Sequence, residues 1–457
     1  MILIFDIGKT NKKCFIFDEN YQEVYREYVR FEELTDEDGF PCDDLAAIET
    51  WVKDSLQKLM NDDRYDISSI NFSTYGASFV HLDKTGKPVA PLYNYLKPYP
   101  EKLQATFYEK YGSPEAIARQ TASPQLGMLN SGMQLYWLKY HRPEIFGQIH
   151  WALHFPQYLS YLLTGLPVSE YTSIGCHTGL WDFEQNDYHE WVYRENIDRI
   201  LPAVVGTDTS INTRIHGKKI RVGVGIHDSS GALLPYLKVD RKPFLLISTG
   251  TWSIALNPFS TTTLTDKELR KDCLNFLRID GDTTKAARLF LGKELSTQVK
   301  RLQKHFGKPD GTYKLVPFDE ELFQKLQAQN ARCFHFDFIV QERVAAPAEK
   351  ALSTFDSFEA AYHQLMLELV ALQIEAAERA IGDTSINKMY IDGGFADNEL
   401  YVQMLSRYFT EVKMRTTQSP LGSALGAAIV LSDKKIDKKF LKKHYAMKKI
   451  RAVKTAS

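Results

Sequence analysis

The sequence has few cysteines and no arrangement of them that suggests a cross-link or a metal site. Its five cysteines are scattered and include no Cys-x-x-Cys pair: Cys14, Cys42, Cys176, Cys273 and Cys333. A disulfide framework and a structural zinc site are therefore not expected, and a reducing cytoplasm is the predicted compartment.

Long hydrophobic runs and a net charge are also lacking. No apolar stretch reaches the length of a membrane-spanning helix, and the N-terminus is apolar only as far as Asp6, without a basic leader. The 56 Lys and Arg residues nearly balance the 57 Asp and Glu residues, for a formal charge of −1. We therefore expect neither a membrane nor a nucleic acid as partner, and any polyanion must be met by a local site.

What is present is the composition of a globular protein with more than one domain. The 457 residues are 44% hydrophobic and 25% charged, which suggests two or three domains. Strand-like segments followed by alternating helices and strands predict an α/β fold with mixed sheets covered by helices. We expect an N-terminal domain over 1–237, with an aromatic-rich insertion at about 98–201, and a C-terminal domain over 238–457.

Apolar periodicity predicts several elements directly. Leu45–Met60 and Phe358–Ile381 have helical spacing, and Gly382 is a stop signal for the second helix. The segment 244–256 repeats the strand, small polar turn and strand of the first 17 residues. This repeat indicates that the chain has two halves with the same order of structural elements.

The opening hairpin is the first candidate phosphate site. A buried strand ends in Asp6, and a turn containing Gly8, Thr10, Asn11 and Lys12 follows. The glycine would let backbone N–H groups approach an anion, while the other residues add donors and Asp6 could face a hydrated cation. The same residues also suit an ordinary turn, so the hairpin alone leaves both interpretations open.

A nucleotide-binding P-loop is absent. Gly8-Lys9-Thr10 resembles the end of one, but the position of the loop's first glycine falls at Leu3, inside a strand. Phosphate recognition would therefore have to use hairpin turns.

Two further turns could complete such a site. The small polar turn at Thr249, Gly250 and Thr251 offers hydroxyl and backbone donors to a phosphate. Gly393 and Gly394 lie between a predicted strand and a predicted helix, where glycines would let a flat base lie against the backbone.

Asp228 is the strongest candidate for a catalytic base. It follows a glycine-rich strand and begins a run of small residues that could open a helix, where a carboxylate is stabilised as the anion. The alternative is that Asp228 only caps the helix. The neighbouring His227 is either a packed histidine or a partner for a sugar hydroxyl.

The lysine-rich tail from Lys434 to Lys454 carries apolar residues at helical spacing. A docked amphipathic helix with a solvated face is favoured over a nucleic-acid-binding tail.

In their order along the chain, these motifs resemble the FGGY family of carbohydrate kinases. The resemblance covers about residues 2–431 and rests on Asp6-Ile-Gly8-Lys9-Thr10-Asn11, Thr74-Tyr75-Gly76-Ala77-Ser78, Gly225-Ile226-His227-Asp228, Ser248-Thr249-Gly250-Thr251-Trp252 and Asp392-Gly393-Gly394. It implies two actin-like, ribonuclease-H-like domains with ATP in the cleft between them, and phosphorylation of a sugar.

The resemblance also implies roles for individual residues. Asp228 would be the catalytic base and Asp6 would help to hold Mg²⁺. The substrate would be bound by Gly76, Ser78, His227 and Asp228. ATP would be bound by Gly8, Thr10, Asn11, Lys12, Thr249, Gly250, Thr251, Gly393, Gly394 and Asn398. Either a monomer or a homodimer is compatible with the family.

The His-Asp pair and the second turn are similar to those of the L-fuculokinase and L-rhamnulokinase branch, which implies L-fuculose or L-rhamnulose as substrate. Two residues depart from that pattern: Ser78 stands where rhamnulokinases have Asp, and Gln134 where the family signature has lysine. A kinase for another ketose or polyol, as in xylulokinases, a sugar sensor without catalysis, and an actin-like ATPase that uses no sugar remain alternatives.

Overall fold

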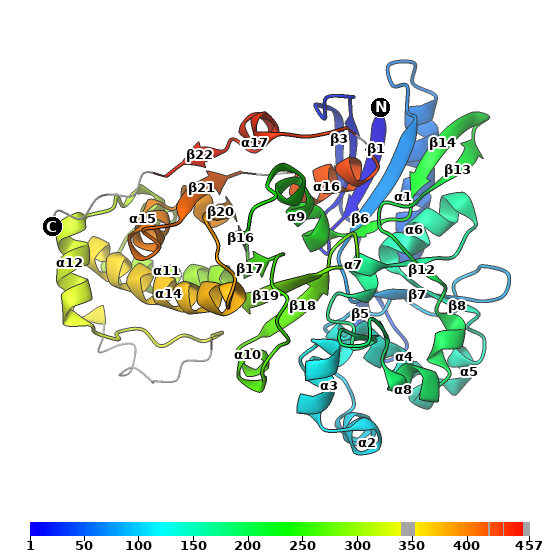
Figure 1. Ribbon diagram of the computed structural model, residues 1–457, viewed down its shortest axis with the longest axis horizontal. Helices are drawn as coiled ribbons and strands as arrows, with labels where there is room; N and C mark the ends of the chain where they lie inside the picture. Colours follow the sequence, from blue (N-terminus) through cyan, green and yellow to red (C-terminus); the bar gives the residue numbers. More distant parts are fainter. Residues whose placement is uncertain (340–351, 419–420, 433, 451–457) are drawn as a thin grey trace.

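The computed structural model describes residues 1–339, 352–418, 421–432 and 434–450. Its chain forms two lobes, each built around a mixed sheet, with a pair of helices between them (Figure 1). The part of the predicted lysine-rich tail beyond residue 450 lies outside the described residues.

The first lobe contains a sheet in which an antiparallel hairpin is extended by parallel strands. The strand order is β13-β14-β6-β1-β2-β3, and the short β15 (Ile226–His227) pairs with β6. The bounds are β1 Ile2–Ile7, β2 Lys12–Phe17, β3 Glu23–Val29, β6 Ser69–Thr74, β13 Ser210–Ile215 and β14 Lys218–Gly223. Helices α1 (Leu45–Met60) and α6 (Phe155–Thr164) pack on this sheet through a shared apolar core.

The second lobe repeats the central part of this plan. Its sheet has the order β18-β19-β17-β16-β20-β21-β22, and β16 pairs antiparallel with β17 and parallel with β20, as β1 does with β2 and β6. The bounds are β16 Phe244–Thr249, β17 Ser253–Asn257, β18 Cys273–Leu277, β19 Thr283–Leu289, β20 Lys388–Gly393, β21 Lys413–Thr417 and β22 Lys448–Lys449. The helices on this sheet include α11 (Leu291–Phe306), α12 (Glu320–Gln329), α14 (Phe358–Ile381) and α15 (Glu399–Tyr408). The repeat predicted from the sequence is thus confirmed, because both sheets contain the same arrangement of three strands.

Two helices lie between the sheets, α9 (Asp228–Val239) and α16 (Gly422–Val430). They touch at two glycines, because a Cβ on Gly426 would stand 1.9 Å from the carbonyl oxygen of Gly231. Such close backbone contact requires residues without side chains. The predicted domain boundary at residue 237 falls inside α9, and the first strand of the second lobe begins at Phe244.

The aromatic-rich insertion forms a helical layer at one end of the first lobe (Figure 1). Its elements include α2 (Glu101–Tyr111), α3 (Pro114–Thr121), α4 (Ser131–His141), α5 (Pro143–Phe146), α7 (Tyr171–Ile174) and α8 (Glu190–Arg194). Its strand β8 (Trp151–His154) pairs with β7 (Phe79–Leu82), which precedes the insertion. Aromatic side chains such as Tyr136, Trp137, Trp181 and Trp191 form a separate core, while Phe155 and Tyr158 of α6 join the core of the first sheet, so these aromatics are core residues, as the sequence predicted.

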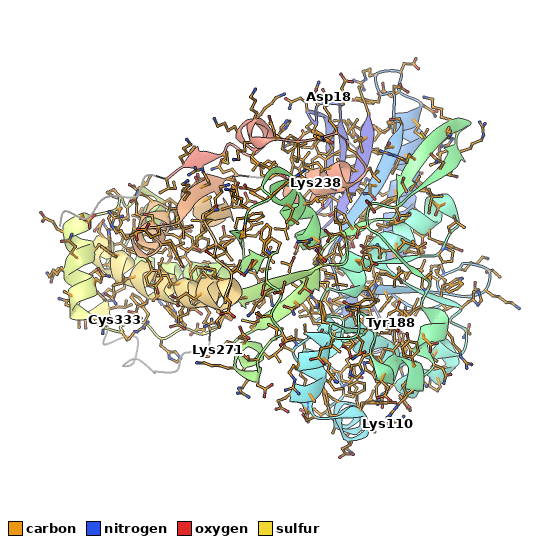
Figure 2. All side chains as sticks on the ribbon, viewed as in Figure 1. Asp18, Lys110, Tyr188, Lys238, Lys271 and Cys333 are labelled. Atoms are coloured by element: carbon orange, nitrogen blue, oxygen red, sulfur yellow. The ribbon has the colours of Figure 1, made fainter. Side chains whose placement is uncertain are left out.

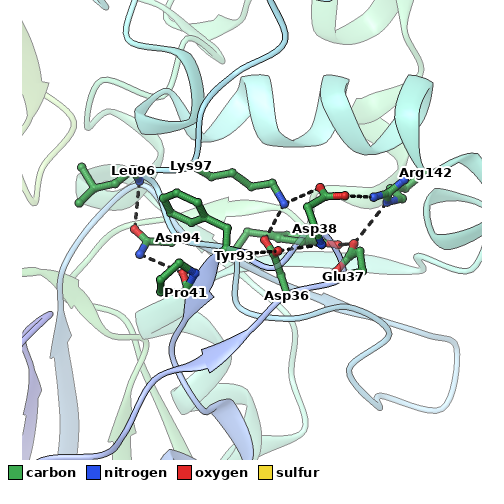
Figure 3. A network of polar contacts seen from close by, with 10 residues as sticks. Asp36, Glu37, Asp38, Pro41, Tyr93, Asn94, Leu96, Lys97 and Arg142 are labelled. Atoms are coloured by element: carbon green, nitrogen blue, oxygen red, sulfur yellow. Dashed lines mark hydrogen bonds and ion pairs between the residues drawn. The ribbon is translucent and has the colours of Figure 1, made fainter.

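An ionic network ties this insertion to the hairpin of β4 (Leu34–Thr35) and β5 (Pro41–Cys42) (Figure 3). The buried Lys97 ammonium lies 2.5 Å from Asp36 and 2.6 Å from Asp38. Arg142, just beyond α4, pairs with Asp38 and Glu37.

The C-terminal segment crosses from one lobe to the other on the face shown at the top of Figure 1. Strand β22 pairs with β21 of the second sheet, while helix α17 (Lys438–His444) packs against α9 and the turn before β3. The ring of Phe440 meets Tyr21 edge to face at 5.5 Å. This confirms a docked helix in the tail, and no helix among the described residues is long and apolar enough to cross a membrane.

Candidate active site

The opening hairpin is a tight turn at the inner end of the first sheet. The N–H of Gly8 donates to the carbonyl oxygen of Asn11 at 3.0 Å, which leaves Thr10 exposed at the tip. The side chain of Asn11 accepts a hydrogen bond from Arg30 at 2.7 Å. The exposed tip thus presents the Thr10 hydroxyl to solvent.

Asp6 is buried beneath this turn, near the junction of the two lobes. One carboxylate oxygen accepts a hydrogen bond from Ser423 of α16 at 2.9 Å, and the other lies 3.3 Å from the ammonium of Lys13. Burial raises the pKa of Asp6 and Lys13 opposes that rise, while the charge of Asp228 raises it further. The two acids selected from the sequence therefore lie close enough to interact.

Lys12 takes a position that the sequence analysis did not foresee. It belongs to β2 rather than to the turn, its side chain is 3% exposed, and its ammonium lies 2.8 Å from Asp43. Lys9 also pairs with Asp43, at 2.5 Å, and the hydroxyl of Tyr75 donates to it at 2.8 Å. Despite burial, the bonds from Lys12 and Lys9 lower the pKa of Asp43.

Asp43 is thus a site-organising residue that sequence reasoning missed. It joins the opening hairpin to the loop after β6, where Tyr75 lies. Nothing in the sequence separates it from the adjacent Asp44, which caps helix α1 by accepting from Ala47 at 2.9 Å.

The second phosphate turn lies between β16 and β17 and is exposed at its tip. The N–H of Gly250 donates to the carbonyl oxygen of Trp252 at 2.7 Å, and Thr251 is exposed. The start of α11 supports this turn from behind, because the N–H groups of Gly292 and Lys293 each donate to Thr251 at 3.1 Å. A Cβ on Gly292 would lie 1.9 Å from the oxygen of Gly250, so the close contact needs glycine.

Thr249 connects the second turn to the glycine pair. Its buried hydroxyl donates to the carbonyl oxygen of Asp392 at 2.5 Å and accepts from the N–H of Phe395 at 3.0 Å. Gly393, at φ +88°, packs against the Thr249 backbone, whereas a Cβ on Gly394 would meet no atom within 4 Å. An open backbone surface at Gly394 fits the flat base of a nucleotide.

Asn398 caps the helix that follows the glycine pair. Its side-chain oxygen accepts from the N–H of Tyr401 at 3.1 Å, and its amide donates to the hydroxyl of Tyr362 at 2.8 Å. Both groups therefore support the start of α15.

Asp228 is the first residue of α9, with a half-buried side chain. The N-cap is His227, and no side chain caps the helix, so the capping alternative for Asp228 is wrong. Its carboxylate lies 3.2 Å from both the Ser229 hydroxyl and Nε2 of His227. The carboxylate therefore lies at the positive end of the helix dipole and is partly exposed, so it could accept a hydrogen bond from a ligand hydroxyl.

A narrow crevice opens beside Asp228 between the loop after β6 and the insertion. It is too narrow in this structure to admit a water molecule, and it is lined by Tyr75, Gly76, Ser78, His154, Phe155, Pro156, Ser173 and His227. A Cβ on Gly76 would lie 3.0 Å from Nε2 of His227, so a larger residue would push into that imidazole.

Polar atoms in this crevice lack protein partners. The Ser78 and Ser173 hydroxyls and the Nδ1 atoms of His154 and His227 are buried without a hydrogen bond. Burial lowers the pKa of His154 to about 3, which keeps its ring neutral. Buried polar groups are normally paired, so a cluster of unpaired ones beside a carboxylate is typical of a site for a hydroxylated ligand. His154 and Ser173 had no sequence signal, since both lie in the insertion.

Gln134, which replaces the family's lysine, holds the crevice wall in shape. Its amide donates to the carbonyl oxygens of Ala77 at 2.6 Å and Met128 at 2.7 Å. Ala77 has φ +58°, a conformation that few residues other than glycine adopt. The departure at Gln134 therefore stabilises the loop that carries Gly76 and Ser78.

The residues present fit a magnesium ion held jointly with a nucleotide. No group of three or more metal-ligating side chains occurs among the residues that the structure describes. Mg²⁺ needs no such cage, since it commonly binds one or two carboxylates and completes its shell with phosphate oxygens and water. Asp6, buried beneath the first exposed turn, supplies a carboxylate of that kind.

Similarity to known proteins agrees with this geometry. Residues 1–227 match the N-terminal domain of the FGGY family of carbohydrate kinases. The rhamnulokinase of Mannheimia succiniciproducens is 26% identical over 433 residues, covering 87% of this chain and 83% of that one. That of Halalkalibacterium halodurans is 26% identical over 263 residues, covering 55% of each chain.

Solved structures share the fold across nearly the whole chain. A carbohydrate kinase from Novosphingobium aromaticivorans superposes with a TM-score of 0.78 at 21% identity, covering 99% of this chain and 97% of that one. Xylulose kinase from Lactobacillus acidophilus gives a TM-score of 0.73 at 13% identity, covering 99% and 93%. The two-lobed α/β fold thus agrees with the sequence match, and the chain belongs to the FGGY family of carbohydrate kinases.

Proposed function

We propose that this kinase transfers the γ-phosphoryl group of ATP to a terminal hydroxyl of a ketose, with L-rhamnulose and L-fuculose as the favoured substrates. The observation that carries the proposal is Asp228, a partly exposed carboxylate at a helix start beside a crevice of unpaired polar groups. The rhamnulokinase relatives support a 6-deoxy-ketose, and the site residues predicted from the sequence remain proposals.

The proposed chemistry is an in-line displacement in which the protein mainly positions the reactants. The crevice, with Ser78, His154 and His227, would hold the sugar hydroxyls, and Asp228 would accept the proton of the attacking hydroxyl. The oxygen so exposed forms a bond to the γ-phosphorus as the bond to the β-phosphate oxygen breaks, giving ADP and a sugar phosphate.

The two exposed turns would hold the phosphates from opposite sides. Gly8 and Thr10 on the first lobe and Gly250 and Thr251 on the second offer backbone and hydroxyl donors. Asp6 would hold Mg²⁺, which neutralises phosphate charge when bound. Because Lys12 is engaged by Asp43, we assign it support of the hairpin in place of direct phosphate contact.

Replacement of the proposed base tests this function. Asp228→Asn keeps the size of the side chain but cannot take a proton, so we expect kcat for ketose phosphorylation to fall by at least about 100-fold. ADP affinity, measured by titration calorimetry, should change less than about threefold, because nothing else at the nucleotide turns is altered.

The measurement is coupled ADP release with L-rhamnulose, L-fuculose, D-xylulose and glycerol, compared as kcat/KM. The matched control is Asp83→Asn, which changes an acid in an exposed turn and should leave turnover unchanged. Near-normal turnover in Asp228→Asn would refute the role of the base, and ATP hydrolysis indifferent to every ketose would refute the sugar kinase itself.

A further inference from the structure

A second polar groove lies on the face away from the proposed active site. It has about 950 Å³ of space between the C-terminal end of α9, the link from α9 to β16, and residues 434–439 before and in α17. Figure 2 places Lys238, at the end of α9, at the junction of the two lobes. Asp228 opens the same helix 10 residues earlier, which at 1.5 Å per residue puts the groove about 15 Å from the proposed base.

The walls of this groove are strongly basic. Seven exposed cationic side chains line it: Lys238, Arg241, Lys242, Lys434, Lys435, Lys438 and Lys439. The whole chain carries a formal charge of only −1, so this concentration of charge is local. Like charges held this close repel one another, and a groove of this kind is stabilised by a bound anion.

The two carboxylates among the described residues that line the groove, those of Asp240 and Asp437, are engaged within the protein. Asp240 is buried and pairs with Lys388 and Tyr390 of β20. Asp437 caps α17 by accepting from the N–H groups of Lys439 at 2.8 Å and Phe440 at 3.3 Å.

Six of the seven cations have no carboxylate partner among the residues that the structure describes. Within the described part of the chain, no ion pair forms at Lys238, Arg241, Lys242, Lys435, Lys438 or Lys439, judged by a nitrogen-to-oxygen distance of 4.0 Å. Lys434 is held to the first lobe through the carbonyl oxygen of Glu19 at 2.9 Å and the side chain of Asn20 at 3.2 Å.

Helix α17, which carries part of the basic cluster, packs firmly on the rest of the protein. Phe440 and Leu441 of α17 are buried, and Tyr445 is fully buried against Tyr236 of α9, with ring centroids 5.6 Å apart. The cations of the two walls are therefore held opposite one another by packing.

From this arrangement we propose that the groove is a binding site for a small polyanion that carries at least two phosphate groups. The proposal is independent of the proposed sugar and its hydroxyl chemistry. Lysine and arginine recognise phosphate through charge-assisted hydrogen bonds, and several cations on two walls suit several phosphates on one ligand.

Larger polyanions fit this groove less well. The large exposed apolar side chains of the described residues, among them Trp252, Leu315 and Tyr408, all lie outside the groove. Proteins that bind single strands stack bases on aromatic rings, and surface helices bind bilayers through apolar side chains. The groove offers neither feature.

The test is titration calorimetry with inorganic tripolyphosphate in the presence of saturating ADP, so that the nucleotide turns are already filled. We expect one tripolyphosphate per chain, with an affinity that falls as salt is raised. The triple variant Arg241→Glu, Lys435→Glu, Lys438→Glu should weaken binding at least tenfold.

The matched control reverses three exposed lysines on the first lobe, Lys84→Glu, Lys87→Glu and Lys102→Glu, and should change affinity less than twofold. A milder variant, Lys435→Gln with Lys438→Gln, should weaken binding by an intermediate factor and guards against misfolding in the triple variant. Unchanged affinity in both groove variants, or equal loss in the control, would overturn the proposal. So would tighter binding of single-stranded DNA or of phosphatidylserine vesicles than of tripolyphosphate.

Discussion

Asp43 is a buried carboxylate that positions two segments of the candidate active site through hydrogen bonds and ion pairs. It receives the ammonium groups of Lys9 and Lys12 and the hydroxyl of Tyr75, so it fixes the opening hairpin against the crevice loop. A buried carboxylate with three donors is stable as the anion. Its loss would leave the buried Lys12 ammonium without a carboxylate partner, while Lys9 would keep only Glu33 at 3.3 Å.

We therefore expect Asp43→Asn to lower the free energy of unfolding by about 3 kcal/mol at neutral pH, the usual cost of breaking a buried ion pair. The folded-state pKa of Asp43 is lowered, so its contribution is present above the unfolded pKa of about 4 and is lost as the pH falls below it. Urea unfolding between about pH 3 and pH 7 measures both effects, and the difference between variant and parent should shrink toward low pH.

Asp44→Asn is the matched control, because Asn is as good an N-cap as Asp and stability should stay within about 0.5 kcal/mol. Equal losses in the two variants would show that Asp43 has no special role.

The position of a single residue could be predicted from the sequence where an acidic residue directly follows a buried strand. Asp6 and Asp228 are acids placed next to buried strands, and they lie close enough for the charge of Asp228 to raise the pKa of Asp6. Lys12 was assigned to the turn because its neighbours are polar, yet its partner Asp43 is distant in sequence. Long-range pairs of this kind leave no local pattern.

At the scale of elements, the contact between α9 and α16 depends on two glycines. A Cβ on Gly426 would collide with the Gly231 oxygen at 1.9 Å, whereas a Cβ on Gly231 would meet the Ser423 oxygen at 3.1 Å. The first contact cannot be accommodated without moving a helix, while the second requires a shift of a few tenths of an ångström.

Gly426→Ala should therefore destabilise the protein by more than Gly231→Ala, although alanine favours a helix over glycine by about 1 kcal/mol in both. We expect a loss of about 3 kcal/mol or more for the first and about 1 kcal/mol or less for the second, as for overpacked core substitutions. Thermal unfolding of the two variants side by side makes the measurement, and the reverse order would contradict the close packing of these helices.

Elements with a complete apolar face were predicted to their bounds, as for α1 and α14. The glycine pair was predicted as a turn, but Asp392 and Gly393 continue strand β20, because hydrogen bonds to β16 extend the strand beyond its apolar run. The two-residue strands of the insertion arise from tertiary packing and have no sequence period.

At the scale of the whole molecule, the C-terminal segment links both lobes on the face that carries the basic groove. Strand β22 belongs to the second sheet, while Phe440 of α17 packs on Tyr21 of the first lobe. The paired lobes and their repeated sheets were foreseen from the sequence repeat, whereas this link was not, since its contacts join residues more than 400 positions apart.

We expect Phe440→Ala to weaken the packing of the C-terminal segment on the first lobe. Truncation of a buried phenylalanine costs about 3–5 kcal/mol, and faster hydrogen exchange should appear in α17, β22 and the turn at Tyr21. The control is Lys442→Ala on the exposed face of α17, expected to change stability by less than about 0.5 kcal/mol. Exchange that stays slow at the Tyr21 turn in Phe440→Ala would show that the segment does not secure the first lobe.

The turn between β16 and β17 also bears on the fluorescence of the protein. Of the six tryptophans, Trp252 is 41% exposed and lies on Phe290 with ring centroids 4.3 Å apart, directly after Thr251. The emission of an indole depends on the polarity and charge around it, so the fluorescence that Trp252 contributes, isolated by comparison with Trp252→Phe, reports on the surroundings of this turn. Trp252 is thus an intrinsic fluorescent probe at the place where the nucleotide is proposed to bind.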